Sequence, residues 1–218
     1  MSGLVGAGRT DVARAIFGVA PPTSGKIKID GQEVQITSSG QAIGLGLAYV
    51  PEDRQTHGLI TPMSIFSNIS LPLLKQYAPG GIVRGQKERN AALGDARQME
   101  VRANNIFQKA RELSGGNQQK VVLAKWLSTK PRILILDEPT RGIDVGTKAA
   151  VHALMSKLAT EGVAILMISS ELPEVMGMSD RILVMHEGQM TAEFTRAEAT
   201  QEKIISAATQ MVATGSAL

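Results

Sequence analysis

The 218-residue chain contains no cysteine, so neither disulfide bonds nor cysteine-ligated metal ions hold its fold. That composition fits a reducing compartment such as the cytoplasm. The chain also lacks an apolar run of about 18 residues, the length that a membrane-spanning helix needs. No basic and then apolar signal opens it. We therefore expect any association with a membrane to depend on a partner.

Aromatic residues are scarce, at 3% of the chain. Proteins that bind single-stranded nucleic acids stack bases on aromatic side chains set among basic ones, and this sequence has no such interleaving. The pI near 9.3 nevertheless leaves nucleic-acid binding open as an alternative.

Positive charge is concentrated in residues 84–132, which carry eleven Lys and Arg against four Asp and Glu. This segment has a net charge of +7, whereas the rest of the chain carries −4. A solvated basic face is the ordinary explanation of such a segment. A phosphate-rich ligand, a nucleic acid or the cytoplasmic rim of a membrane protein would also suit it.

Hydrophobic patterning predicts strands that alternate with helices, which is typical of an α/β fold with a mostly parallel sheet. Residues 61–112 differ, because they combine helical spacing with many polar side chains, and we expect a helical subdomain over about 61–128. The whole chain, 1–218, is then one domain. Strands are expected at 26–30 and 33–36 (a small antiparallel hairpin), 47–50, 132–136, 163–168, 181–186 and 189–194, and helices at 11–18, 39–45, 117–128, 146–160 and 197–210.

A glycine-rich string opens the chain and is expected to follow a short strand. Glycines let backbone N–H groups turn toward a phosphate, and the helix that follows adds its positive N-terminal end. Arg9 stands where phosphate loops usually have lysine, and the hydroxyl of Thr10 suits Mg²⁺. Taken alone, the string is also consistent with a structural turn. Its candidate phosphate-binding residues are Gly3, Gly6, Ala7, Gly8, Arg9 and Thr10.

Two adjacent carboxylates, Asp137 and Glu138, follow an apolar strand. The carboxyl ends of parallel strands are where α/β sheets bind ligands. Asp137 is placed to hold Mg²⁺, and Glu138 to polarise an attacking water as a general base. The alternative is a buried strand that runs into an acidic turn.

A third string, Leu-Ser-Gly-Gly-Asn-Gln-Gln at residues 113–119, begins another helix. It resembles the signature motif of ABC (ATP-binding cassette) ATPases, as does its position shortly before the Asp-Glu strand. In that family two nucleotide-binding domains pair head to tail, with each ATP and its Mg²⁺ between the phosphate loop of one and the signature motif of the other. The resemblance implies that four residues complete the site of a partner domain: Ser114, Gly115, Gly116 and Gln118.

The resemblance assigns four further residues. Asp144 matches the acidic residue of a loop that crosses the dimer interface. Glu52 stands where most members have a glutamine that touches Mg²⁺ and the attacking water. Ser170 stands where most have a histidine that contacts the γ-phosphate. With Arg9 in place of lysine, these departures imply a slow, degenerate site in this domain.

This combination of departures is similar to the C-terminal cassette of the fused ATPase subunits of bacterial monosaccharide importers, such as those for ribose, galactose or xylose. That resemblance implies an N-terminal cassette as partner, a transmembrane sugar permease docked on residues 61–112, and an extracytoplasmic sugar-binding protein acting indirectly. It also implies a peripheral place on the cytoplasmic face of the inner membrane. Because so few residues precede the glycine-rich string, we expect a fragment of a longer polypeptide, with the adenine-stacking aromatic upstream.

Two other functions remain open. One is a soluble ABC ATPase that acts on nucleic acid. The other is a structural module with a vestigial phosphate loop, although Thr10, Asp137 and Glu138 argue against complete decay.

Overall fold

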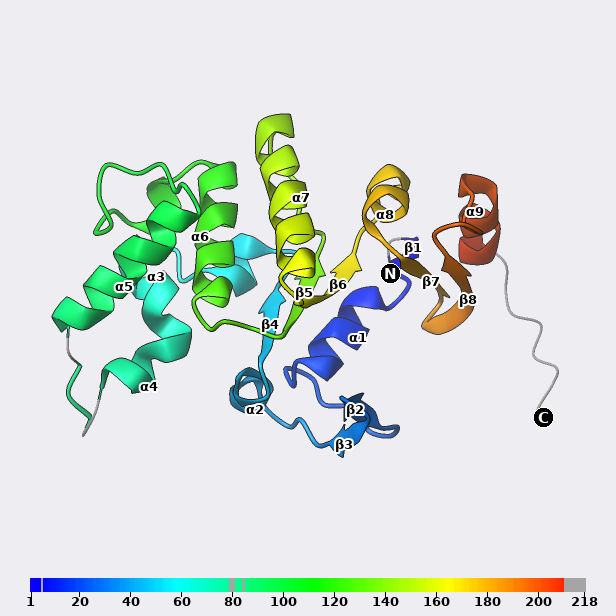
Figure 1. Ribbon diagram of the computed structural model, residues 1–218, viewed down its shortest axis with the longest axis horizontal. Coiled ribbons are helices and arrows are strands. Elements are labelled where there is room, and N and C mark those ends of the chain that lie inside the picture. Colours follow the sequence, from blue (N-terminus) through cyan, green and yellow to red (C-terminus); the bar gives the residue numbers. More distant parts are fainter. Residues whose placement is uncertain (5, 79–80, 84, 210–218) are drawn as a thin grey trace.

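The computed structural model describes residues 1–4, 6–78, 81–83 and 85–209. Its centre is a parallel sheet, which Figure 1 shows with helices on either side. Continuous apolar runs form these strands because both faces of such a sheet are covered. Three parallel strands lie in the order β4-β5-β6, namely β4 (Leu47–Val50), β5 (Ile133–Asp137) and β6 (Ala164–Ile168).

Three more strands lie in the order β1-β7-β8, with β7 and β8 antiparallel. They are β1 (Ser2–Gly3), β7 (Arg181–His186) and β8 (Gln189–Thr195). Met1 joins the two sets, because its carbonyl accepts the Ser169 N–H at 3.2 Å and its amino group donates to the Met167 carbonyl. The result is a continuous sheet in the order β4-β5-β6-β1-β7-β8, and the expected parallel core is confirmed.

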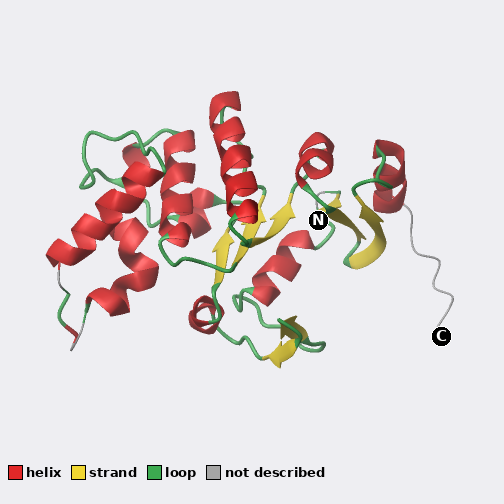
Figure 2. Cartoon of the chain, viewed as in Figure 1, coloured by secondary structure: helices red, strands yellow, loops and turns green. Residues whose placement is uncertain are grey.

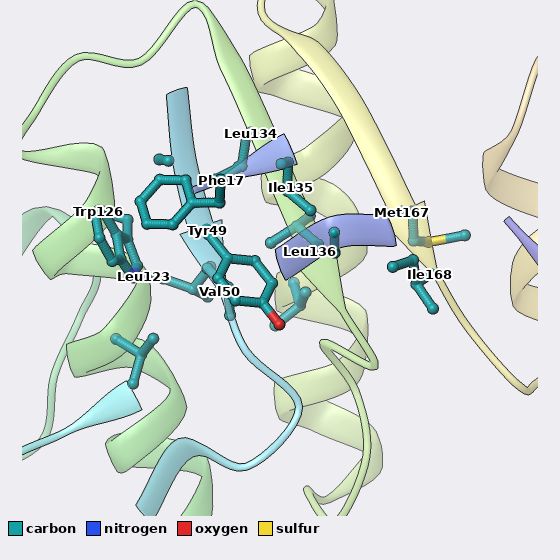
Figure 3. Packing of buried hydrophobic residues seen from close by; sticks show 14 of the residues in the cluster. Phe17, Tyr49, Val50, Leu123, Trp126, Leu134, Ile135, Leu136, Met167 and Ile168 are labelled. Carbon is teal, nitrogen blue, oxygen red and sulfur yellow. The ribbon is translucent and has the colours of Figure 1, made fainter. Parts of the chain in front are cut away.

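The core is densest around β5, where Leu134, Ile135 and Leu136 are fully buried. Figure 3 shows Phe17 beside Trp126 and near these side chains. The Phe17 and Trp126 rings meet edge to face, with centroids 5.2 Å apart, a favoured geometry for aromatic pairs. This contact ties the first helix to the last helix of the helical lobe.

Helices cover both sides of the strands. In the view of Figure 1, α1 lies below them and α7 and α8 lie above. Helix α7 begins at an Asp144 cap whose side chain accepts the Thr147 N–H. The covering helices are α1 (Arg9–Ile16), α2 (Ser39–Gly44), α7 (Val145–Thr160), α8 (Leu172–Met178) and α9 (Gln201–Thr209).

A helical lobe follows β4, at the left of Figure 2. Helix α3 packs against both α5 and α6, so the lobe has its own small core. Helices occupy the segment in which helical spacing was expected. They are the π-helix η1 (Arg54–Gly58), α3 (Ile65–Ser70), the 3₁₀ helix η2 (Leu71–Leu73), α4 (Leu74–Tyr77), α5 (Gly85–Gln98), the 3₁₀ helix η4 (Ala110–Glu112) and α6 (Gly115–Leu127).

The expected hairpin is present as β2 (Ile27–Ile29) and β3 (Gln32–Val34), which pair antiparallel. Its two turn residues, Asp30 and Gly31, have φ values of 52° and 78°. Two successive left-handed residues make the tight turn whose twist matches that of paired strands.

Most predicted elements are present with ends shifted by one or two residues, and three differences are larger or concern the site. Helix α1 begins at Arg9 rather than at residue 11, because Gly8 in the left-handed region starts it. Helix α8 was not predicted, since it is short and Pro173 and Gly177 obscure its pattern. Helix α9 begins at Gln201 rather than at 197, and its expected end at 210 lies outside the described residues. Across the part of the chain that the structure describes, no helix is long and apolar enough to cross a membrane.

Candidate nucleotide site

The glycine-rich string forms a tight loop between β1 and α1. A Cβ atom at Gly3 would lie 2.3 Å from the Met185 carbonyl oxygen, so only glycine fits this close approach. Gly6 and Gly8 have φ values of 85° and 86°, which other residues adopt at a cost. Ala7 is buried, and its N–H donates to the Leu4 carbonyl at 3.1 Å. The loop therefore delivers the N-terminus of α1 to the carboxyl edge of the sheet, which is an anion-binding arrangement.

Asp137 ends β5 and is completely buried. Its Oδ2 accepts the Tyr49 hydroxyl at 3.1 Å, while its Oδ1 has no hydrogen-bond partner among the described residues. Burial raises the pKa of Asp137, against the nearby Thr10 hydroxyl, the hydrogen bond from Tyr49 and the charge of Arg9, which lower it. The same desolvation, joined by the charge of Asp137, raises the pKa of Tyr49.

The pairing of Thr10 with Asp137 fits Mg²⁺. A buried carboxylate oxygen without a donor is uncommon in folded proteins. A hard cation with oxygen ligands would satisfy it, and the Thr10 hydroxyl lies beside it. No cluster of three or more acidic, His or Cys side chains occurs in the described residues. The remaining ligands would accordingly be phosphate oxygens and water, as Mg²⁺ usually takes them.

Glu138 is held by two neighbours. Arg9 Nη2 lies 3.3 Å from its Oε1, and the Ser170 hydroxyl donates to its Oε2 at 3.0 Å. Arg9 also donates to the Ser169 carbonyl at 2.8 Å, and its side chain is only 7% exposed. Arg9 and Ser170, which both depart from the family pattern, thus each contact one carboxylate oxygen of Glu138, the expected general base.

Glu52 lies apart from Asp137 and forms an ion pair with Arg141. Its neighbour Arg54 donates to the carbonyls of Arg141 and Gly142, at 3.1 and 3.2 Å. Glu52 and Thr10 do line one cavity of about 590 Å³. Magnesium contact by Glu52, as expected from its position in the sequence, stays a prediction.

The signature residues form a second centre. Ser114 precedes α6, and Gly115 and Gly116 form its first turn. A Cβ at Gly116 would lie 2.7 Å from the Thr147 hydroxyl, so α6 and α7 approach closely here. Asp144 stands beside them, and its hydrogen bonds from the Thr147 N–H and hydroxyl lower its pKa. A cavity of about 460 Å³ has these groups on its wall, lined by Glu100, Arg102, Ser114, Gly116, Asn117, Lys120, Asp144, Gly146, Thr147 and Ala150.

Gln118, which the signature resemblance places among the nucleotide-binding residues, is packed inside this chain. Gln118 is 3% exposed. Its amide donates to the Ala110 carbonyl and accepts from Gln55, both at 3.2 Å. Gln118 fastens α6 to η1 and η4 and does not line the signature cavity.

Sequence reasoning did not assign roles to Tyr49, Arg54, Asn117 or Arg141, which the structure places at the two centres. Tyr49 and Arg54 belong to the string Tyr-Val-Pro-Glu-Asp-Arg, in which a buried tyrosine at a strand end was a usable signal. The partners of Arg54 and Arg141 come from distant segments, so no local pattern identified them.

The sheet carries the glycine-rich loop and the Asp-Glu strand, and the helical lobe carries the signature turn. Together they define a P-loop ATPase of the cassette type. The chain belongs to the ABC transporter family, whose pattern matches residues 1–141. Ribose import ATP-binding protein RbsA 1 of Streptomyces coelicolor is 54% identical over 96% of this chain and 41% of its own length. A putative ribose/galactose/methyl galactoside import ATP-binding protein of Pseudomonas syringae is 50% identical over 94% of this chain and 39% of its own. The chain thus spans about two fifths of the length of these curated relatives.

Solved structures support the fold. A dimeric ATP-binding cassette bound to ADP and Pi superposes with a TM-score of 0.76 at 24% identity, over 89% of this chain and 83% of that one. A nucleotide-free cassette from an ABC transporter gives a TM-score of 0.74 at 20% identity, over 96% and 87%. At these identities the likeness establishes the cassette fold alone.

Proposed function

We propose that this chain is the second nucleotide-binding domain of a fused ATPase subunit in an ABC importer for a monosaccharide, and that it couples the binding and hydrolysis of ATP to sugar uptake. One contrast carries the proposal. The signature turn opens onto a cavity, whereas the expected base of the domain's own site is engaged by Arg9 and Ser170. The import functions named for the relatives support the substrate class.

At the domain's own site, backbone N–H groups of the loop around Gly6 and Gly8 would bind phosphates. Thr10 and Asp137 would hold Mg²⁺, which as a Lewis acid neutralises charge on phosphate oxygens. Arg9 adds a further positive charge, but it lies on Glu138. Since a general base contributes about 10²–10⁴-fold to a rate, its engagement gives a site that binds nucleotide and turns it over slowly.

At the other site, Ser114, Gly115 and Gly116 would complete the ATP pocket of an N-terminal cassette, and Asp144 would lie at the interface. ATP would join the two cassettes, and hydrolysis at the standard site would let them separate. Residues 61–112 would pass that movement to a transmembrane permease. The subunit would then lie peripherally on the cytoplasmic face of the inner membrane, and a sugar-binding protein outside would act through the permease.

Two single changes test the proposal in the full-length subunit assembled with its permease. Ser114→Arg places a large cation in the cavity of the productive site, whereas Arg9→Ala alters only the slow site. We expect Ser114→Arg to lower ATPase activity and transport by about 10²-fold or more, and Arg9→Ala to have the smaller effect. The assignment of the two sites is reversed if Arg9→Ala is the more damaging change.

A further inference from the structure

The Asn117 side chain connects the signature turn to the loop that follows α5. Its Oδ1 accepts the backbone N–H of Arg102 at 2.8 Å, and its Nδ2 donates to Ser114 Oγ at 3.0 Å. Arg102 and Ser114 both line the signature cavity. Asn117 thus links two parts of one wall.

The direction of these two bonds is fixed by chemistry. A backbone N–H can only donate, so the Asn117 atom that faces Arg102 has to be the amide oxygen. The other atom is then the NH₂ group, which can only donate, and Ser114 Oγ has to accept. The hydroxyl hydrogen of Ser114 is therefore not used in this bond.

That hydrogen has no acceptor elsewhere in the described residues. Ser114 is the cap residue of α6, yet its side chain accepts no N–H of the first turn, and its Oγ forms the bond with Asn117 alone. Ser114 is exposed at the cavity that also holds Arg102 and Lys120. An anionic ligand in this cavity would meet a hydroxyl donor beside two basic residues.

We propose that Asn117 is a positioning residue that keeps Ser114 as a hydrogen-bond donor toward the γ-phosphate of the ATP held by the partner cassette. The proposal rests on the proposed function, because Ser114 must serve that ATP for its orientation to matter. Asn117 does not touch the nucleotide in this scheme. It donates to one of the two lone pairs of Ser114 Oγ and leaves the O–H free for the phosphate.

A double-mutant cycle tests this in the full-length subunit assembled with its permease, with kcat and KM for ATP measured separately. Asn117→Ala should lower kcat/KM about three- to tenfold, the range for one ordinary hydrogen bond. In a Ser114→Ala background the same change should have almost no further effect, since residues that act through one another are not additive. Asn90→Ala, an exposed asparagine on α5, is the matched control.

Asn117→Asp gives a second, independent readout. Its carboxylate still accepts the Arg102 N–H, but its other oxygen can only accept from Ser114 and turns the hydroxyl hydrogen away from the cavity. We expect Asn117→Asp to reduce kcat/KM more than Asn117→Ala does, while the melting temperature of the subunit stays near that of the parent.

The outcomes separate the two proposals. If Ser114→Ala leaves ATP turnover unchanged, the proposed function of the signature cavity fails. If Ser114→Ala lowers turnover but Asn117→Ala has no effect in the parent, the positioning role is overturned and the proposed function stands. An equal effect of Asn117→Ala with and without the Ser114 hydroxyl overturns the positioning role as well.

Discussion

The surroundings of Asp137 and Asp144 shift the pKa of the carboxyl group in opposite directions at the two centres. Burial raises the pKa of Asp137, whose Oδ1 finds no donor among the described residues. Hydrogen bonds from Thr147 lower the pKa of Asp144, which caps α7. Ionised Asp137 therefore destabilises the fold when no ligand is bound, whereas Asp144 stabilises the helix that it caps.

This contrast predicts opposite effects of pH on two amide variants without nucleotide. The folded state binds the Asp137 proton more tightly than the unfolded chain, so ionised Asp137 destabilises the fold once the pH rises above its unfolded pKa of about 4. Asp137→Asn should therefore raise the melting temperature at pH 7–8, and the gain should vanish as the pH falls to about 4. Thermal melts across this pH range measure it.

Asp144→Asn is the control for that series. The pKa of Asp144 is lowered, so its ionised form contributes stability above its unfolded pKa, and that contribution is lost as the pH falls through the folded pKa. Its removal should give no gain at neutral pH. A lower melting temperature for Asp137→Asn than for the parent at pH 8 would contradict the interpretation of the buried carboxylate.

At the scale of elements, the sequence predicted what depends on local pattern. The strand at residues 47–50 was predicted with its final boundaries, because its apolar run stops at a proline. The pair of Arg9 with Glu138 was not predictable, since it joins segments brought together only by the order of strands. The burial of Gln118 was not predicted, because its bonds to Ala110 and Gln55 join segments outside the signature motif.

Some of the basic side chains of the helical lobe form hydrogen bonds within the lobe itself. Lys125, counted in the basic segment, donates to the Gly58 carbonyl at 3.0 Å, and burial lowers its pKa to about 8. Lys120 donates to the Glu100 carbonyl at 3.1 Å. Part of the positive charge therefore holds the lobe together, which leaves less of it for a nucleic acid or a lipid surface.

The proposed docking of the helical lobe on a permease can be tested by crosslinking. Leu74 on α4 is 36% exposed, and Ile82 beyond it is 77% exposed, so apolar side chains face outward there. Because the chain has no cysteine, single cysteines at Ser67, Leu74 and Ala78 introduce unique crosslinking sites. In the assembled transporter we expect at least one to crosslink to cysteines on the cytoplasmic loops of the permease.

A cysteine at Ser206 on α9 provides the control, because that position is also exposed but belongs to the far end of the fold. Crosslinking at Ser206 together with silence at all three lobe positions would move the docking surface from the helical lobe to the terminal helix.

At the scale of the whole molecule, the glycine-rich loop and the signature cavity are two separate centres. None of the described residues of the loop at 3–10 lines the signature cavity, and that loop lies beside Asp137, at the end of β5, and Glu138, which follows it. The glycine-rich loop offers backbone N–H groups for phosphate, and the signature turn offers the Ser114 hydroxyl as a donor. These groups lie apart, so neither centre alone offers both. The separation of the two centres agrees with the proposed pairing with a second cassette.

The isolated chain should therefore be a poor ATPase for two separable reasons: its own base is engaged, and no signature motif faces its phosphate loop. In a steady-state assay with Mg²⁺ we expect turnover well below the ordinary enzyme range of about 1–10³ s⁻¹. Adding a separately produced N-terminal cassette should raise turnover. Ser114→Arg in this chain should abolish the rise, because the productive site would lose the Ser114 hydroxyl that completes it. Turnover within the ordinary range from the chain alone would mean that Arg9 leaves Glu138 readily, and that the unequal division of labour between the two sites is wrong.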